Sequence, residues 1–288
     1  MGNEVLVKEI SGNVGTLRIN RPERRNALSP DLLAELHLTL KKWAEEDIVR
    51  VVVITGNSEK TFSAGYDIPT IPTDISPDAA EFLKRDNPLE RALASVKNFP
   101  FPVIAMTNGY CFGAGLNLAM CCDMRIGADH IKVGMPPAKL SLVYHPEGLS
   151  HFIEVIGMAK TREFFFTGHT YAGREVKDMG LVDHLVPMDK LSGTVYALAK
   201  EISKNAPLAL KGTKKILNMI GKYSLIDSEY LHDAQALVVE AFNSDDLKEG
   251  HYVASLDMLR VCYPRISRYE KLNNTPHIPP MPCYCNNR

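Results

Sequence analysis

The sequence predicts an α/β fold, because strand-like runs alternate with helical patterns over most of the chain and helical patterns dominate after Pro187. Two runs rich in valine and isoleucine, at 51–55 and 103–106, have the length and composition of strands that are buried on both faces. A loop that contains glycine follows each of them. We therefore expect a core domain at 1–203, a helical region at 204–262 and an extended, proline-rich tail at 263–288.

The N-terminal part of the chain carries clear start and stop signals. Strand-like runs at 5–10 and 14–20 flank a Ser-Gly-Asn turn, which predicts a β-hairpin. Ser29 and Pro30 are typical of a helix N-cap and first helical residue, and an apolar stripe with helical spacing continues to Trp43. Later helices are expected at 81–97, 148–157, 159–166 and 172–179, with a strand at 181–185 and helix breaks at Ala206, at Gly221 and near Ser244.

Composition and charge exclude several classes of partner. The chain has 288 residues, of which 45% are hydrophobic and 23% charged, and its net charge is −1. This balance provides no strong field for nucleic acid or an anionic membrane. No run reaches the roughly 18 apolar residues of a membrane helix, and residues 1–8 lack the apolar core of a signal peptide. We therefore expect a cytoplasmic protein with no nucleic-acid or membrane partner.

The six cysteines do not predict a metal site. Cys111, Cys121 and Cys122 lie in or beside an apolar segment and are expected to be core residues. Cys283 and Cys285 in the tail supply two ligands, whereas a structural zinc site needs four.

Two glycine loops carry the strongest functional signal. The stretch 108–123 leads from one buried strand through a glycine loop into a helix, and 62–68 follows the other buried strand. A strand, glycine loop and helix in this order present free backbone N–H groups at a helix N-terminus, where an anion is stabilised. We expect the two loops to face each other and to stabilise one developing anion. The alternative is that their glycines only permit close packing of strand against helix.

Four sequence landmarks identify the family that the chain resembles. They are Asn-Arg-Pro-Glu-Arg-Arg-Asn-Ala-Leu at 20–28, Phe-Ser-Ala-Gly-Tyr-Asp-Ile at 62–68, the stretch 102–123 with its Gly-Ala-Gly, and the Thr-Gly, Gly-Leu-Val-Asp and Val-Pro motifs within 167–187. In order and spacing they resemble the crotonase (enoyl-CoA hydratase/isomerase) superfamily over residues 4–260. A single glycine turn is weak evidence, whereas landmarks in one register are strong evidence.

The resemblance implies a spiral of repeated ββα turns, a helical C-terminal region that mediates trimerisation, and acyl-CoA thioester substrates. Coenzyme A would be part of the substrate, so no separate cofactor is expected, and the assembly would be a homotrimer or a dimer of trimers. The backbone N–H groups of Tyr66 and Ala114 would form the oxyanion hole for a thioester enolate. The matching positions imply CoA- and substrate-binding roles for Arg24, Arg25, Ala27, Ala64, Asp67, Ile68, Tyr110, Gly113, Pro136 and Pro137.

The chain departs from the family's hydratases at both catalytic glutamates. The matching positions hold Asn117 and Pro137. Neither side chain titrates near neutral pH, so neither can act as a general base. The departure argues against the two-glutamate hydration of an enoyl-CoA and leaves Asn117 as a hydrogen-bonding wall of the acyl pocket.

The loop at 135–148 offers the remaining catalytic candidates. Its Met-x-Pro-x-x-Leu-x-x-x-Tyr pattern resembles the family's methylmalonyl-CoA decarboxylases, in which a tyrosine at the position of Tyr144 holds the substrate carboxylate. Decarboxylation of a malonyl-type acyl-CoA needs no base, because loss of CO2 generates the enolate directly. One position departs from that subgroup, which carries a histidine where this chain has Tyr66.

Two neighbouring residues support a different reaction. His145 falls where isomerases and a dehalogenase of the family place an acidic residue, and Glu147 resembles the glutamate of an isomerase Pro-Glu-Gly motif. An isomerase, hydratase or hydrolase that uses one of them therefore stays open, as does a non-catalytic member that binds acyl-CoA. An extended loop would point Tyr144 and His145 to opposite sides, so that only one need face the acyl group. His151 and His184 are expected to be structural.

Overall fold

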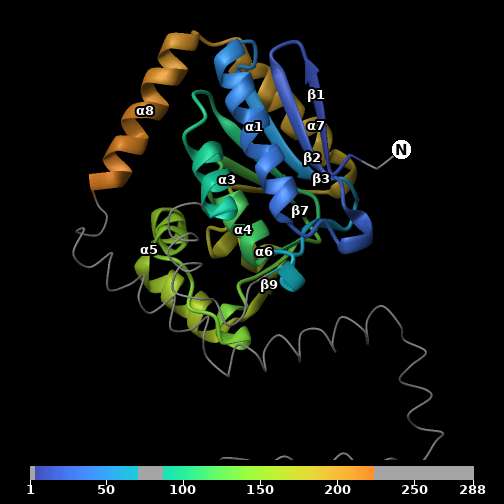
Figure 1. The fold of residues 1–288 in the computed structure, drawn as a ribbon, viewed down its shortest axis with the longest axis vertical. Helices are drawn as coiled ribbons and strands as arrows, with labels where there is room; N and C mark the ends of the chain where they lie inside the picture. The colour runs from blue at the N-terminus through green and yellow to red at the C-terminus, as the bar shows by residue number, and fades with distance from the viewer. Residues whose placement is uncertain (1–3, 71–86, 224–288) are drawn as a thin grey trace, which may run out of the picture.

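The computed structural model describes residues 4–70 and 87–223 (Figure 1). Ten strands form two sheets, one of six strands in the order β1-β2-β3-β5-β7-β10 and one of four in the order β4-β6-β8-β9. Our predictions for 71–86, for the helical region beyond residue 223 and for the tail with Cys283 and Cys285 lie outside the described residues.

The six-stranded sheet is mostly parallel. Its strands are β1 (Leu6–Ser11), β2 (Val14–Ile19), β3 (Val51–Gly56), β5 (Val103–Thr107), β7 (Met124–Ala128) and β10 (His184–Val186). β1 pairs antiparallel with β2, which confirms the predicted hairpin, and every other neighbouring pair is parallel.

Three of the four strands of the second sheet directly follow a strand of the first, and the fourth, β9, comes after α5 (Pro146–Thr167). The members of the second sheet are β4 (Thr61–Ser63), β6 (Tyr110–Phe112), β8 (Lys132–Gly134) and β9 (Thr170–Ala172). β3 continues into β4, β5 into β6 and β7 into β8, so each turn of the chain adds one strand to each sheet. This arrangement confirms the predicted α/β fold with a ββα spiral.

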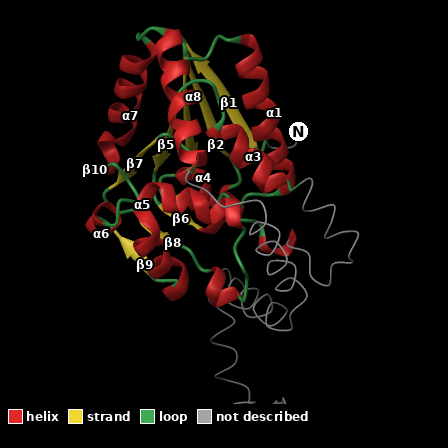
Figure 2. Ribbon diagram, turned by 90° about the vertical axis from the view of Figure 1, so that its left-hand side faces the viewer, coloured by secondary structure: helices red, strands yellow, loops and turns green. Residues whose placement is uncertain are grey.

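Helices cover both faces of the six-stranded sheet, as Figure 2 shows with α7 on one side and α1 and α3 on the other. Val52 and Ile54 of β3 pack into the core under α1 and α3, whereas Val51 and Val53 pack under α7. The valine-rich run is therefore buried on both faces, as its composition predicts. The helices are α1 (Pro30–Glu46), α3 (Pro88–Lys97), α4 (Gly113–Met120), α5 (Pro146–Thr167), α6 (Arg174–Asp178), α7 (Met188–Ser203) and α8 (Pro207–Tyr223).

Local signals predict several helix ends correctly. The Ser29 hydroxyl caps α1 by accepting from Leu32 N–H, and Pro30 is the first helical residue. The two helices expected at 148–157 and 159–166 join as α5 at a kink, where Gly157 has a φ of +76°. The break at Ala206 separates α7 from α8.

Three local predictions have wrong boundaries. α8 continues through Gly221, because one glycine costs a helix only about 1 kcal/mol. The strand expected at 181–185 lies at His184–Val186; Leu181 and Val182 are apolar because they are buried in the core. The helix expected at 172–179 is present as α6, but it is shorter, because Ala172 is the last residue of β9 and Gly173 is the N-cap. In these cases, an apolar run or a residue's helix propensity was read as the boundary of an element.

Candidate active site

The two glycine loops lie in direct contact. Gly65 has a φ of +106° and Gly113 a φ of +51°, a region that side chains rarely adopt. A Cβ atom added to Gly65 would lie 3.1 Å from the Phe112 carbonyl oxygen and 3.6 Å from the Ala114 nitrogen. The backbone of the first loop therefore faces the first turn of α4.

Other glycines in these loops serve packing. A Cβ atom on Gly109 would lie 2.1 Å from the Lys60 carbonyl oxygen, and one on Gly115 would lie 2.5 Å from the Ser63 Cβ. The packing alternative thus holds for these two positions, whereas Gly65 and Gly113 have backbone conformations that favour glycine.

The backbone around the loops leaves two N–H groups unused. Leu28 N–H donates to the Gly65 carbonyl and Asp67 N–H donates to the Leu28 carbonyl, which brackets Tyr66. Ala114 lies in the first turn of α4, where N–H groups have no partner within the helix. Across residues 4–70 and 87–223, neither the Tyr66 nor the Ala114 N–H donates a backbone hydrogen bond. At Ala114, the helix dipole also favours negative charge.

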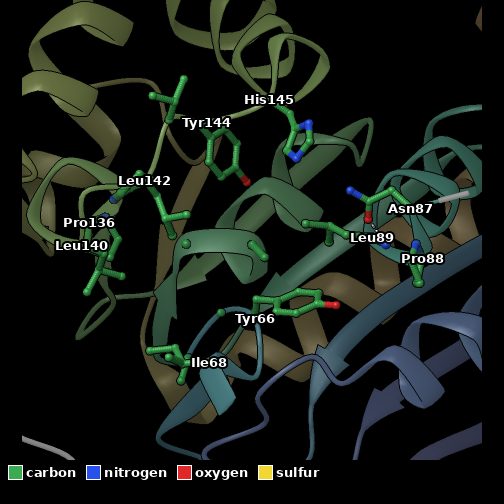
Figure 3. A pocket seen from close by; sticks show the side chains of 16 residues that line it. Tyr66, Ile68, Asn87, Pro88, Leu89, Pro136, Leu140, Leu142, Tyr144 and His145 are labelled. Carbon is green, nitrogen blue, oxygen red and sulfur yellow. Dashed lines mark hydrogen bonds between the residues drawn. The ribbon is translucent and has the colours of Figure 1, made fainter. Parts of the chain in front are cut away.

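A pocket of about 190 Å³ opens beside these groups (Figure 3). Its walls are mostly apolar and come from four segments of the chain. The lining residues are Ala64, Gly65, Tyr66, Ile68, Asn87, Pro88, Leu89, Gly113, Ala114, Pro136, Pro137, Leu140, Leu142, Val143, Tyr144 and His145. None of them carries a carboxylate or a permanent positive charge.

Tyr144 and His145 both line the pocket, so the extended-loop argument does not apply. The loop coils into a 3-10 turn at Pro137–Leu140 and passes through Ser141 at a φ of +54°; His145 then precedes α5. The Tyr144 ring packs on Phe165 with centroids 5.3 Å apart. Burial lowers the pKa of His145, so its imidazole is neutral at pH 7.

A hydrogen-bonded chain supports Tyr144 from behind. The Asn117 Nδ2 group donates to the Tyr144 hydroxyl oxygen over 2.9 Å, and Asn117 Oδ1 lies 3.0 Å from His151 Nδ1. Asn117 is fully buried and does not line the pocket. Burial raises the pKa of Tyr144 well above its usual range and lowers that of His151 to about 4. Both side chains are therefore neutral at physiological pH.

Two glutamates lie behind the pocket. Glu147 is in the first turn of α5 and does not line the cavity. Glu90, to which sequence reasoning gave no role in the site, lies in the first turn of α3; burial and then the charge of Glu147 raise its pKa to about 7. The sequence does not show that Glu90 is influenced by Glu147, because the starts of α3 and α5 come together only in the fold. Asn87, Pro88 and Leu89 line the pocket for the same reason, although sequence reasoning gave them no place in the site.

The residues expected to bind coenzyme A fall into two groups: the pocket lining includes Ala64, Ile68, Gly113, Pro136 and Pro137, and it does not include Arg24, Arg25, Ala27, Asp67 or Tyr110. Arg24 and Arg25 are exposed, and Tyr110 is exposed with the Lys132 ammonium 5.8 Å from its ring centroid. The Asp67 carboxylate forms an ion pair with the Arg21 guanidinium over 2.8 Å, and Arg21 also donates to the Ala27 carbonyl. Asp67 and Ala27 therefore hold the loop at 20–28 against the first glycine loop.

The described residues contain neither a candidate metal cluster nor a candidate membrane-spanning helix. In the part of the chain that the structure describes, His, Cys, Asp and Glu side chains form no cluster of three that could hold a metal ion. The helices within 4–70 and 87–223 include none long and apolar enough to cross a bilayer.

Known proteins are similar to this chain in sequence and in fold. A family model described as enoyl-CoA hydratase/isomerase matches residues 9–254. The short-chain-enoyl-CoA hydratase of Clostridium acetobutylicum is 31% identical over 250 residues, which cover 87% of this chain and 93% of that protein. The crotonyl-CoA hydratase of Syntrophomonas wolfei is 30% identical, with 87% and 94% covered.

Two solved structures illustrate the similarity in three dimensions. A methylmalonyl-CoA decarboxylase in complex with 2-nitronate-propionyl-CoA superposes with a TM-score of 0.81 at 24% identity, covering 89% of this chain and 97% of that one. An enoyl-CoA hydratase from Bacillus anthracis superposes with a TM-score of 0.70 at 28% identity, covering 83% and 90%. At 24% identity, the decarboxylase shows the shared fold alone.

Proposed function

The chain belongs to the enoyl-CoA hydratase/isomerase family of acyl-CoA enzymes, and we propose that it stabilises a thioester enolate between Tyr66 N–H and Ala114 N–H. The observation that carries this proposal is the contact of the two glycine loops beside one apolar pocket. A thioester enolate concentrates its negative charge on one oxygen, which two backbone donors in a water-poor site stabilise strongly.

We propose decarboxylation of a malonyl-type acyl-CoA as the reaction. The C–C bond to the carboxylate breaks, its electron pair enters the thioester carbonyl to form the enolate, and CO2 leaves. A proton from solvent or a neighbouring acid is then added to the α-carbon. Among the residues that the structure describes, 4–70 and 87–223, no carboxylate lines the pocket, which supports this choice because a charged glutamate would repel an anionic substrate.

A hydratase, isomerase or hydrolase is the second candidate. His145 lines the pocket and is neutral, so it can accept a proton from water or from an α-carbon. The relatives that are about 30% identical carry hydratase names. Glu147 is a weaker candidate for the base, because it lies outside the lining.

Turnover assays separate the two candidates. Incubation with methylmalonyl-CoA and with ethylmalonyl-CoA is expected to release CO2 and form the shorter acyl-CoA, whereas crotonyl-CoA is expected to remain unhydrated. Lack of CO2 release from both malonyl esters would exclude the decarboxylase. In that case, deuterium exchange at the α-carbon of a simple acyl-CoA would still show that an enolate forms. If neither CO2 release nor deuterium exchange is detected, the chain is a non-catalytic acyl-CoA-binding protein.

We also propose that the chain assembles as a trimer or a dimer of trimers. Leu208, Leu217 and Ile220 of α8 are 84%, 62% and 60% exposed, which is unusual for large aliphatic side chains gathered on one helix. Sedimentation equilibrium on the full chain would show a trimer mass or a multiple of it.

A further inference from the structure

We propose that His151 is a positioning residue, which acts through Asn117 to hold Tyr144 as a hydrogen-bond donor toward the acyl group. The inference rests on the proposed acyl-CoA function, and it assigns a role to a histidine that sequence reasoning treats as structural. Three side chains from α4, from the loop before α5 and from α5 itself form the chain of contacts.

The direction of the chain follows from which atoms can donate. Asn117 Oδ1 can only accept, so the hydrogen bond to His151 Nδ1 over 3.0 Å requires the imidazole proton on Nδ1. Asn117 Nδ2 can only donate, so the Tyr144 oxygen accepts over 2.9 Å. The Tyr144 O–H is then left to donate elsewhere, and in Figure 3 its oxygen points into the pocket.

The surroundings of His151 are compatible with this tautomer. Cys121 Sγ lies 3.3 Å from the same Nδ1 and can accept a weak second hydrogen bond from its N–H group. His151 and Cys121 are 8% and 5% exposed, so water has little access to compete for these contacts. A buried histidine with a single proton must place it on one nitrogen, and the acceptor at Asn117 favours Nδ1.

Packing keeps the three side chains in this arrangement. Gly148, in the first turn of α5, lies against two of them, Tyr144 and Asn117. A Cβ atom at Gly148 would be 2.4 Å from Tyr144 Cε1 and 2.9 Å from Asn117 Nδ2. Phe165 packs on the Tyr144 ring from α5, with centroids 5.3 Å apart. The phenol therefore has little freedom to turn away from the pocket.

A consequence follows for the ligand. A neutral phenol that donates into an apolar pocket binds an acceptor oxygen, and it does not act as a base. The acyl groups that Tyr144 favours are therefore those with an acceptor oxygen in addition to the thioester carbonyl, as in a malonyl-type carboxylate. A plain saturated acyl chain offers Tyr144 no acceptor.

The tautomer can be tested without any substrate. Nitrogen-15 shifts of the His151 ring in selectively labelled protein at pH 7 are expected to show a protonated Nδ1. A protonated Nε2 instead would mean that Asn117 is reversed and that Tyr144 donates to it, which would overturn the proposal.

The functional role is tested with a double-mutant cycle. His151→Phe keeps the ring but removes the donor, and we expect a loss of roughly tenfold in kcat/KM for a malonyl-type ester, comparable to one lost hydrogen bond. In a Tyr144→Phe background the same change is expected to have no further effect. His151→Gln, whose amide can donate to Asn117, is expected to recover activity in part. Equal additional losses in both backgrounds would show a structural role only.

A binding experiment keeps this result separate from the proposed reaction. Calorimetry with the thioether analogue of a malonyl-type CoA ester, which has no carbonyl to form an enolate and so does not decarboxylate, and with propionyl-CoA is expected to show a preference for the ligand that carries the extra carboxylate. His151→Phe should reduce that preference and leave the propionyl-CoA affinity unchanged. If neither ligand binds, the acyl-CoA function fails; if both bind and His151→Phe leaves the preference unchanged, only the positioning role fails.

Discussion

The two sides of the pocket are built in different ways. One side consists of backbone N–H groups held by the conformations of Gly65 and Gly113, within loops that directly follow strands. The other side consists of the side chains of Tyr144 and His145, supported by Asn117 from a different helix. Backbone groups tolerate changes of side chain, so the first side can serve any thioester enolate. Under the proposed function, we expect the second side to determine which acyl group binds and which reaction follows.

The backbone side is the more sensitive of the two to a single substitution. Gly65→Ala places a side chain at a φ of +106° and 3.1 Å from the Phe112 carbonyl oxygen, so the loop must shift and Tyr66 N–H moves with it. We expect kcat to fall on the order of a hundredfold, as when one oxyanion donor is lost.

Gly12→Ala is the matched control for this substitution. Gly12 also has a positive φ, of +58°, and no atom within 4 Å of an added Cβ atom. It is expected to lower the melting temperature slightly and to leave kcat unchanged. If both variants lose activity equally, backbone strain and not oxyanion geometry explains the effect.

The side-chain side can be perturbed at Gly148. Gly148→Ala brings a Cβ atom to 2.4 Å from Tyr144 Cε1, which displaces the phenol and its contact with Asn117. We expect kcat/KM for a malonyl-type ester to fall roughly tenfold or more, while enolate exchange on a simple acyl-CoA changes little. Gly193→Ala in α7 is the control, because an added Cβ atom there meets nothing within 4 Å and helix propensity should slightly raise stability. Equal losses in both assays would mean that the two sides do not act separately.

The choice between reactions is tested at His145 and Glu147. If the enzyme is a decarboxylase, His145→Ala is expected to reduce kcat less than about tenfold, because no base is needed. Glu147→Ala is expected to have a smaller effect, since its side chain does not line the pocket. A fall of a hundredfold or more in His145→Ala, measured on any CoA ester that turns over, would favour the base-catalysed alternative.

The smallest expected effect concerns stability and pH at Glu90. Its pKa is raised to about 7 in the folded chain, so the folded state binds the proton more tightly than the unfolded state. Its contribution to stability is therefore fully present below the ordinary glutamate pKa, about 4.5, and is lost as pH rises through about 7. Glu90→Gln should therefore raise the free energy of unfolding more at pH 8 than at pH 5.

Urea unfolding at the two pH values measures this difference. Glu45→Gln on α1, where the side chain is exposed, serves as the control and should show no such dependence. If Glu90→Gln and Glu45→Gln change the free energy of unfolding equally at both pH values, the pH dependence arises from other groups.

Much of the fold was predictable because its signals are local. The hairpin, the Ser29 cap and the doubly buried run at 51–55 each depend on residues that are adjacent in sequence. β6 was missed because three residues between glycines carry almost no periodicity, and it forms only because β4 and β8 lie on either side. Gly221 shows the opposite error, in which a local breaker is overridden by the rest of the helix.

The candidate site divides along the same line. The glycine spacing and the missing glutamates at Asn117 and Pro137 are visible in the sequence, and they predict the family and the kind of intermediate. No spacing predicts that Asn117 connects Tyr144 to His151, or that Glu90 approaches Glu147, because these pairs meet only through the packing of α3, α4 and α5. Backbone conformation is set by neighbouring residues, whereas a hydrogen-bond network and a shifted pKa depend on groups that are distant in sequence and close in space.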